Sequence, residues 1–296
     1  MNAVAPPPPR QPSGPRHPPP AGAVDAHTHI FGPIEHFAPV GTQSYPPPHA
    51  PYEAHAAMLA TAGLARGIVV QPGVYGQDCS AILDALARSE GALRGIGVAD
   101  AAQPDATLES WNRAGIRGLR FVEVPDPRTG GRWAGSVGFD DLERMAPRLR
   151  ALGWQAQLWA DCETILKAAP MLRRLGIPVV IDHMARLQTA RGVADPGFQN
   201  LLRLLADGEI WVKLSLCRVS TRRPGYDDLR PFHDALVAAN PERLLWGSDW
   251  PHVNMGDAAP DVGHLIDLLD DWLGDDGVRR AILVDNPTRL FGFGRD

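Results

Sequence analysis

Short apolar segments recur along the chain and alternate with segments whose apolar residues are spaced by three and four. The first pattern is typical of buried strands and the second of amphipathic helices. Strands are predicted at residues 24–30, 67–71, 95–99, 115–121, 155–160, 178–183, 210–215 and 244–249. Helices are predicted between them, at residues 52–64, 81–87, 139–152, 164–175, 198–205 and 229–239.

Eight strands that alternate with helices indicate an α/β protein with a (β/α)₈ barrel of the TIM type. An open, doubly wound sheet is the alternative, but that fold places a glycine-rich turn after its first strand. This chain has His27-Thr28-His29 there. We therefore expect one barrel domain at residues 23–296, preceded by a disordered, proline-rich tail at residues 1–22.

Composition narrows the class of protein. Hydrophobic residues make up 44% of the chain and charged residues 21%, which is typical of a soluble globular enzyme. The net charge of -5 predicts no nucleic-acid partner, and no apolar stretch approaches the roughly 20 residues that cross a bilayer. Cys79, Cys162 and Cys217 lack metal-like spacing, so we interpret them as reduced thiols of a cytoplasmic enzyme. The sequence indicates no particular oligomeric state.

Titratable residues gather where the predicted strands end. In a barrel of this type the active site lies at the carboxyl ends of the strands. The residues at these ends are His27, His29, Arg120, His183, Arg218 and Asp249. Burying such groups is costly unless they are paired or take part in function, so this end of the barrel is the predicted active site.

Three motifs carry a family resemblance: His27-Thr28-His29, His183, and the segment 247–252, Gly-Ser-Asp-Trp-Pro-His. With them, the chain resembles the amidohydrolase superfamily over residues 23–293. Within the superfamily it is similar to the branch of 2-pyrone-4,6-dicarboxylate lactonases, on segments 25–33, 118–121, 180–184, 211–213 and 285–287.

The resemblance also bears on a metal cofactor. Metal-dependent members of the superfamily add a histidine after strand five, and binuclear members often add a lysine after strand four. This chain has Leu158-Trp159-Ala160 and Arg120 at those places, and we interpret Lys213, on strand seven, as part of an ion pair below the barrel rim. The lactonase branch works without a metal, which implies no cofactor. The alternative is a single zinc ion held by His27, His29 and Asp249.

A lactonase needs an activated water and donors for the carbonyl oxygen. Asp249 is the expected general base. His27, His29 and His183 are expected to polarise the carbonyl as hydrogen-bond donors to the developing oxyanion. The predicted activity is hydrolysis of a small carboxylated lactone from aromatic or sugar-acid catabolism, and this anionic lactone is the expected partner.

Arginines are the candidates for holding the substrate carboxylate. Arg120 and Arg218 have the geometry for a bidentate clamp. Salt bridges to acidic neighbours such as Glu123 are the alternative for these two side chains. Arg128 and Arg132, in the loop at 125–136, are weaker candidates for a second anion contact.

Three further residues are expected to bind substrate. The resemblance implies this role for Tyr45, after strand one, and for Asn254, after the strand-eight motif. Arg186 follows His183 closely and is a candidate either to orient it or to hold an anion. The lactonase has a serine where this chain has residues 71–73, and Gly73 cannot donate a hydroxyl hydrogen bond, so the exact lactone stays open. His252 is expected to lie behind the site.

Other activities stay open at this point. A metal-dependent decarboxylase of an aromatic or unsaturated acid would hold zinc tightly and lose activity to chelators. A sugar-lactone isomerase would use Asp249 to move a proton rather than to activate water. A binding protein without catalysis is disfavoured because the whole set of candidate groups is intact.

Overall fold

A computed structural model describes residues 8–40 and 45–294. Its eight strands form one parallel sheet in the order β1 to β8, and every predicted strand is present. The strands are β1 Val24–Thr28, β2 Arg66–Val70, β3 Leu93–Gly97, β4 Ile116–Val122, β5 Gln155–Trp159, β6 Val179–Ile181, β7 Trp211–Leu214 and β8 Leu244–Trp246. The TIM-type barrel is confirmed.

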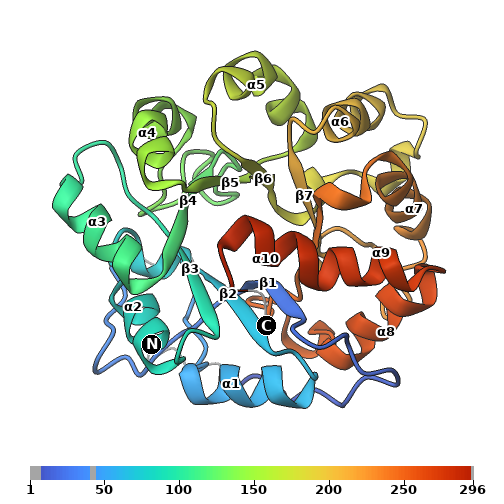
Figure 1. Cartoon of the computed structure of the whole chain (residues 1–296), viewed down its shortest axis with the longest axis horizontal. Helices are drawn as coiled ribbons and strands as arrows, with labels where there is room; N and C mark the ends of the chain where they lie inside the picture. The colour runs from blue at the N-terminus through green and yellow to red at the C-terminus, as the bar shows by residue number, and fades with distance from the viewer. Residues whose placement is uncertain (1–7, 41–44, 295–296) are drawn as a thin grey trace.

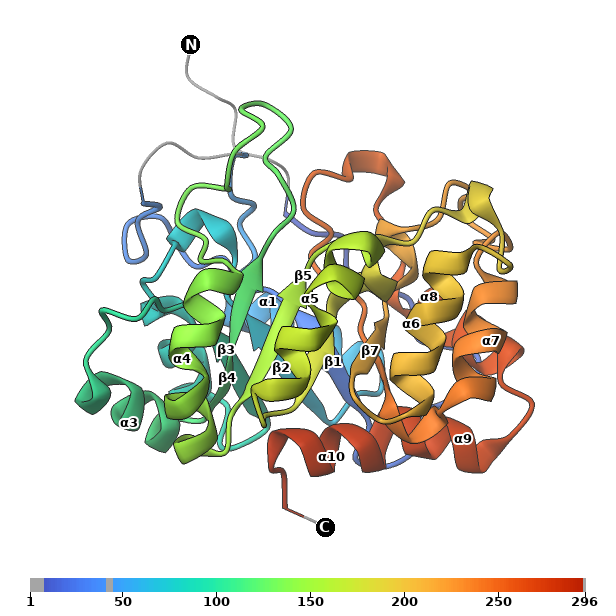
Figure 2. The same cartoon turned by 90° about the horizontal axis from the view of Figure 1, so that it is seen from above.

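The helices surround the strands (Figure 1). They are α1 Tyr52–Thr61, α2 Ser80–Arg88, α3 Asp105–Ala114, α4 Phe139–Leu152, α5 Cys162–Arg174, α6 Pro196–Ala206, α7 Arg230–Ala239, α8 Val262–Trp272, α9 Asp276–Arg280 and α10 Asn286–Phe291. Six of these match the predicted helices, whereas α3, α8, α9 and α10 were not predicted. Helix α10 crosses one end of the barrel, and the loop after β4 lies at the other end (Figure 2).

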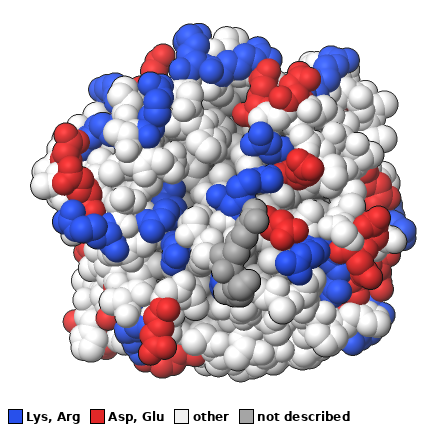
Figure 3. Space-filling model, in the orientation of Figure 1, with Lys and Arg blue, Asp and Glu red and all other residues white. Residues whose placement is uncertain are grey.

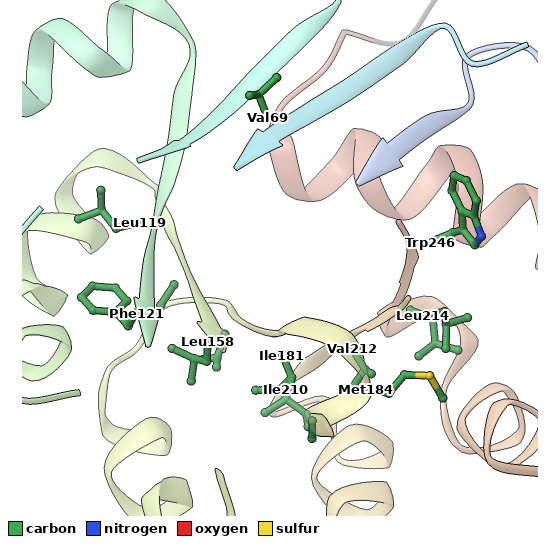
Figure 4. Packing of buried hydrophobic residues seen from close by; sticks show 14 of the residues in the cluster. Val69, Leu119, Phe121, Leu158, Ile181, Met184, Ile210, Val212, Leu214 and Trp246 are labelled. Carbon is green, nitrogen blue, oxygen red and sulfur yellow. The ribbon is translucent and has the colours of Figure 1, made fainter. Parts of the chain in front are cut away.

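The apolar residues form two layers. Side chains such as Leu119, Phe121 and Leu158 lie between the strands and the surrounding helices (Figure 4). A second, smaller cluster fills the barrel interior, and Phe291 and Phe293 close it from the side of α10. Apolar side chains therefore fill the barrel interior at the end covered by α10. The polar residues inside the barrel lie towards the other end, where the strands have their carboxyl ends.

Strands β1 and β8 close the barrel through a few hydrogen bonds rather than a continuous ladder. Thr28 and Trp250 form an isolated parallel bridge. The Asp249 N–H donates to the His27 carbonyl at 2.8 Å, and the His29 N–H donates to the Trp250 carbonyl at 2.8 Å. We call this junction the β1–β8 seam; it is made by residues of the predicted active site.

Asp25 adds a side-chain clamp to the β1–β8 seam. Its Oδ1 accepts hydrogen bonds from the His27 N–H at 3.1 Å and the Ser248 N–H at 3.0 Å. The side chain is fully buried, and burial raises its pKa to about 7. One carboxylate therefore ties the histidine-bearing strand to the residue that precedes Asp249.

The predicted tail at 1–22 has two parts in the structure. Residues 1–7 lie outside the described residues. Residues 8–22 were expected to be disordered, yet Ser13 hydrogen-bonds Asp261 at 2.8 Å and Arg16 pairs with Asp267 and Asp271. These carboxylates, at the start of α8 and within it, attach this segment to the barrel; the sequence pattern could not show these long-range partners.

The surface and the thiols agree with the composition. Lys and Arg are interspersed with Asp and Glu on the face shown in Figure 3. Cys79, Cys162 and Cys217 are free. Within the described ranges, every helix is too short or too polar to cross a membrane.

Candidate active site

A cavity of about 230 Å³ opens at the carboxyl ends of the strands. The predicted site residues that line it are His29, Tyr45, Arg120, His183, Arg186, Arg218, Asp249 and Asn254. His27 lies directly beside it, because its Nε2 is 3.3 Å from the His29 Nε2. The structure therefore brings together every predicted site residue.

Asp249 lies against three imidazoles. Its Oδ1 is 3.5 Å from the His27 Nε2, 3.4 Å from the His29 Nε2 and 3.9 Å from the His183 Nε2. The other ring nitrogen of His29 lies 2.7 Å from the Val70 carbonyl oxygen. Asp249 itself is 1% exposed. A small molecule in the cavity would meet one carboxylate oxygen and imidazoles from β1 and from the end of β6.

The alternation of inward and outward side chains along β1 shifts by one residue before the two histidines. Val24 and Ala26 pack in the barrel interior, yet His29, at an odd position, lines the cavity, and the His27 Nε2 lies 3.3 Å from the His29 Nε2. A register irregularity in the pairing of β1 with β2, between Asp25 and Thr28, accommodates this change. The two imidazoles lie side by side, with their ring centroids 5.0 Å apart.

A left-handed turn presents His183 and Arg186. Residues 183–186 all have φ between 48° and 54°. Non-glycine residues pay about 1–2 kcal/mol each for this conformation, so the surrounding structure must enforce it. The turn carries the His183 ring and the Arg186 guanidinium to the cavity wall, and Asp249 also has a left-handed φ, of 63°.

Burial and charge set the protonation of these groups. Burial lowers the pKa of His183 to about 4, and burial together with Lys213 holds the pKa of His27 well below its ordinary value. Burial would raise the pKa of Asp249, but the Arg218 guanidinium and the imidazoles outweigh it and hold that pKa well below its usual range. At neutral pH the site therefore holds an ionised Asp249 beside neutral His27 and His183.

A second polar cluster lies beneath His27, and we call it the floor cluster: Lys213, Asp182, Gln157 and Arg120. The Lys213 Nζ is 3.1 Å from the Asp182 Oδ1 and 2.6 Å from the Gln157 Oε1. The Arg120 Nε donates to the Asp182 Oδ2 at 3.1 Å. Burial lowers the pKa of Lys213 to about 8, against the opposing charge of Asp182. The ion pair expected for Lys213 is confirmed.

The two clamp arginines pair with acids other than Glu123. Arg120 pairs with Asp182, and its Cζ lies 5.1 Å from the centre of the Trp159 ring. Arg218 pairs with Asp249 through Nε. Glu123 instead accepts from the Phe139 N–H and lies near Arg132, because the loop after β4 turns it away from the cavity.

The loop after β4 contributes to the cavity with residues that the sequence did not single out. Arg128 pairs with Asp126, and Arg132 pairs with Asp140, so neither lines the cavity. The residues of this loop that line it are Trp133, Ala134, Gly135 and Ser136. The glycine- and proline-rich composition gave no signal for which of its residues face inward.

Gly73 and His252 differ in their relation to the cavity. Gly73 lines it, and a Cβ added there would meet no atom within 4 Å, so the cavity is open where the lactonase branch has a serine. His252 does not line the cavity; it is 5% exposed, and burial lowers its pKa to about 4. It lies behind the site, as expected, but its ring nitrogens form no hydrogen bond with the described residues.

Three of the site's ligand atoms satisfy the spacing of a metal site. The Nε2 atoms of His27 and His29 and the Oδ1 of Asp249 lie 3.3, 3.4 and 3.5 Å from one another. Ligands about 2.0–2.1 Å from a tetrahedral zinc ion are separated by about 3.3 Å, so the distances fit. A metal would also need a free lone pair on each Nε2, so the position of the proton on each ring decides whether the two histidines can bind it.

The comparisons agree with this geometry. A family model described as amidohydrolase matches residues 24–293. The 4-sulfomuconolactone hydrolase of Hydrogenophaga intermedia is 36% identical over 279 residues, covering 92% of this chain and 89% of that protein. The 2-pyrone-4,6-dicarboxylate hydrolase of Comamonas testosteroni is 34% identical over 290 residues, covering 95% and 93%.

Two further proteins extend these similarities. The D-galactarolactone isomerase of Agrobacterium fabrum is 28% identical over 276 residues, covering 92% of this chain and 91% of that protein. A crystal structure of an apo protein from Agrobacterium tumefaciens has a TM-score of 0.82 and 27% identity, covering 95% of this chain and all of that one. The family match, which spans the whole barrel, shows that this chain belongs to the amidohydrolase family.

Proposed function

We propose that this protein is a hydrolase that opens a small anionic lactone. The observation that carries the proposal is the Asp249 carboxylate, ionised at the cavity floor within 3.9 Å of three imidazole nitrogens and paired with an arginine. Related hydrolases at 36% and 34% identity are named for a sulfomuconolactone and a pyrone dicarboxylate. Both names describe rings that carry acidic groups.

The carboxylate is the group that activates water. A water that donates to the Asp249 Oδ1 would attack the lactone carbonyl while Asp249 accepts its proton. The ring C–O bond then breaks, and the proton held by Asp249 passes to the leaving ring oxygen, which restores the carboxylate. Because Arg218 keeps the pKa of Asp249 low, the free carboxylate is a weak base. A substrate anion that draws Arg218 towards itself would raise that pKa, so substrate binding would strengthen the base.

The imidazoles divide into donors and an acceptor. His27 and His183 are neutral at pH 7, and each can donate one N–H towards the carbonyl oxygen. In its neutral form His29 donates from Nδ1 to the Val70 carbonyl, which leaves its Nε2 as an acceptor. We therefore revise the role of His29: it would orient the attacking water rather than stabilise the oxyanion.

Arg186 is the first candidate for the substrate's acidic group. Arg120 and Arg218 are each paired with a buried carboxylate, whereas Arg186 forms no ion pair with any residue in the described ranges. Tyr45 and Asn254 line the same cavity and can add neutral hydrogen bonds. Arg120 and Arg218 keep terminal N–H groups for the substrate, and so remain candidates for a second contact.

We also propose that the reaction needs no metal and takes place in the cytoplasm. The imidazole donors and the arginines supply the charge stabilisation that a metal would otherwise give. If a metal is bound, His27, His29 and Asp249 would hold it, and it would polarise the carbonyl as a Lewis acid. Three free thiols support a reducing compartment.

A panel of lactones tests the proposal. It contains pyrone dicarboxylates, a sulfonated muconolactone and a sugar-acid lactone, with hydrolysis followed as proton release with and without a chelator. We expect at least one acidic lactone to be hydrolysed, and we expect Asp249→Asn to reduce kcat by about 10³-fold. Asp257→Asn, an exposed change eight positions further on, is the matched control.

The products separate the alternatives. NMR of the product distinguishes a ring-opened acid from the shifted ring that an isomerase would release. Loss of activity to the chelator together with release of CO₂ would instead establish the decarboxylase. If Asp249→Asn retains full hydrolysis of a good substrate, the base assignment is wrong.

A further inference from the structure

Lys213 is completely buried below the cavity, where no substrate atom can reach it. Its Nζ lies 2.6 Å from the Gln157 Oε1, 2.9 Å from the His27 Nδ1 and 3.1 Å from the Asp182 Oδ1. An ammonium group has three N–H donors and no acceptor, and these three atoms can accept one hydrogen bond each. The Lys213 ammonium group therefore forms hydrogen bonds with Gln157 and His27 and an ion pair with Asp182.

This contact fixes the proton of His27. A neutral imidazole carries its proton on one nitrogen, and the hydrogen bond made by the other nitrogen decides which. Since Nδ1 accepts from Lys213, the proton lies on Nε2. The neighbours of Nε2 fit this arrangement, because the His29 Nε2 at 3.3 Å and the Asp249 Oδ1 at 3.5 Å are both acceptors.

We propose that Lys213 is a positioning residue that holds His27 in the tautomer with the proton on Nε2. In that tautomer His27 is a hydrogen-bond donor to the cavity, and its lone pair is not available to a metal ion. The consequence for catalysis rests on the proposed lactone hydrolysis, in which His27 donates to the carbonyl oxygen. The tautomer itself does not depend on the substrate.

Asp182 provides the opposite arrangement. Its Oδ1 lies 3.3 Å from the same Nδ1 of His27. Without the ammonium group, this carboxylate would accept a hydrogen bond from a protonated Nδ1, and the lone pair of the neutral ring would then lie on Nε2. A carboxylate behind a histidine is typical of metal sites, because it fixes the ring and raises its basicity. Lys213 thus selects hydrogen-bond donation over the metal ligation that the distances would allow.

Lys213→Met tests this directly, because methionine is an unbranched side chain only one atom shorter than lysine and has no N–H groups. Lys167→Met is the matched control: Lys167 lies exposed in α5 and pairs with Glu163. Long-range ¹H–¹⁵N NMR of the full-length protein reports which nitrogen of His27 carries the proton. Titration with zinc alone, against a competing chelator, reports affinity.

We expect the proton of His27 on Nε2 in the wild type and in Lys167→Met, and on Nδ1 in Lys213→Met. Zinc affinity should rise at least about 10-fold in Lys213→Met alone, the scale on which outer contacts tune metal sites. Against a good lactone, Lys213→Met should lower kcat with little change in KM, whereas a loosened cavity would raise KM.

Several results would overturn the inference. One is a wild-type spectrum with the proton on Nδ1, which needs no variant and so decides the question even if Lys213→Met does not fold. Others are an unchanged tautomer, or an unchanged zinc affinity, in a folded Lys213→Met. Failure of the proposed function is distinct: no lactone would be hydrolysed, while the NMR and zinc measurements would stand.

Discussion

Asp249 and Asp182 are two buried carboxylates that contact the same imidazole from different sides. Asp249 lies 3.5 Å from the His27 Nε2 and lines the cavity. Asp182 lies 3.3 Å from the His27 Nδ1 and does not line it. Among the arginines and lysines that the structure describes, Asp249 pairs with Arg218, whereas Asp182 pairs with both Arg120 and Lys213.

The comparison shows how one chemical group serves two purposes. In both places nearby cations outweigh burial and hold the pKa of the carboxyl well below its usual range. Only Asp249 can transfer a proton to or from a bound molecule, because only Asp249 reaches the cavity. Asp182 holds Lys213 and Arg120 in place instead. Access to the cavity therefore distinguishes the carboxylate proposed to react from the carboxylate that supports its neighbours.

The largest expected effect comes from Asp182→Asn. Removing this charge leaves Lys213 and Arg120 buried without their anion, and breaking such a buried pair costs about 3–5 kcal/mol. The free energy of unfolding, measured with urea, should fall by that amount. Asp249→Asn should cost far less, because Arg218 is partly exposed. Equal losses in the two variants would break the distinction between the carboxylates.

Arg218→Gln should lower kcat/KM by about 10²-fold and change the pH profile. The guanidinium favours the ionised form of Asp249, so its removal raises the pKa of that carboxyl. Because the ionised form is the active one, the acid limb of the profile should move to higher pH. Arg222→Gln, an exposed change nearby, is the control. If the acid limb of the profile does not move, Arg218 does not control the pKa of Asp249.

Arg186→Gln should raise KM by about 10-fold with little change in kcat, since a contact to the substrate anion away from the reacting bond supports binding in both ground and transition states. Steady-state kinetics on an acidic lactone and on its neutral ester measure this effect. The neutral ester should lose the dependence on Arg186. If KM increases equally for both substrates, the acidic group of the substrate is bound by Arg120 or Arg218 and not by Arg186.

Asp25→Asn extends the comparison to a buried carboxyl that pairs with no cation among the described residues, and its effect depends on pH. Its pKa is raised to about 7 from an ordinary 3.8, so folding favours the protonated acid. Wild-type stability from this group is full below about pH 4 and is lost as pH rises towards 7. Asparagine stays neutral and can still accept both backbone hydrogen bonds.

The stability of Asp25→Asn relative to wild type should therefore rise between pH 4 and 7, by at most ~1.4 kcal/mol per pH unit. Urea unfolding across this range measures it, with Asp257→Asn as the control. A difference that stays constant with pH would mean that Asp25 titrates normally.

Much of the fold was readable from the chain because each strand is a short apolar run with a clear beginning and end. Helix α3 was not predicted, since Leu108 and Trp111 are its buried residues and leave little periodicity. Helix α8 buries Gly263 and Asp267 along with its apolar residues, which obscures its pattern. Helix α10 spans six residues and is too short for a periodic signal.

The site divides in the same way. His27, Asp249 and the arginines could be named because the barrel places strand ends at one edge. The contact between Lys213 and His27 joins residues 186 positions apart, and it depends on which strands face each other across the interior. The left-handed turn at 183–186 is equally hidden, because none of its residues is a glycine.

The β1–β8 seam has a consequence for molecules that are not fully folded. The backbone bonds that join its two edges belong to His27, His29, Asp249 and Trp250. If this junction opens during a local fluctuation, the base and its imidazoles separate in the same event. A partly open molecule would then have no catalytic activity, rather than activity on a wider range of substrates. A ligand that bridges the junction would protect these amides from hydrogen exchange before any others.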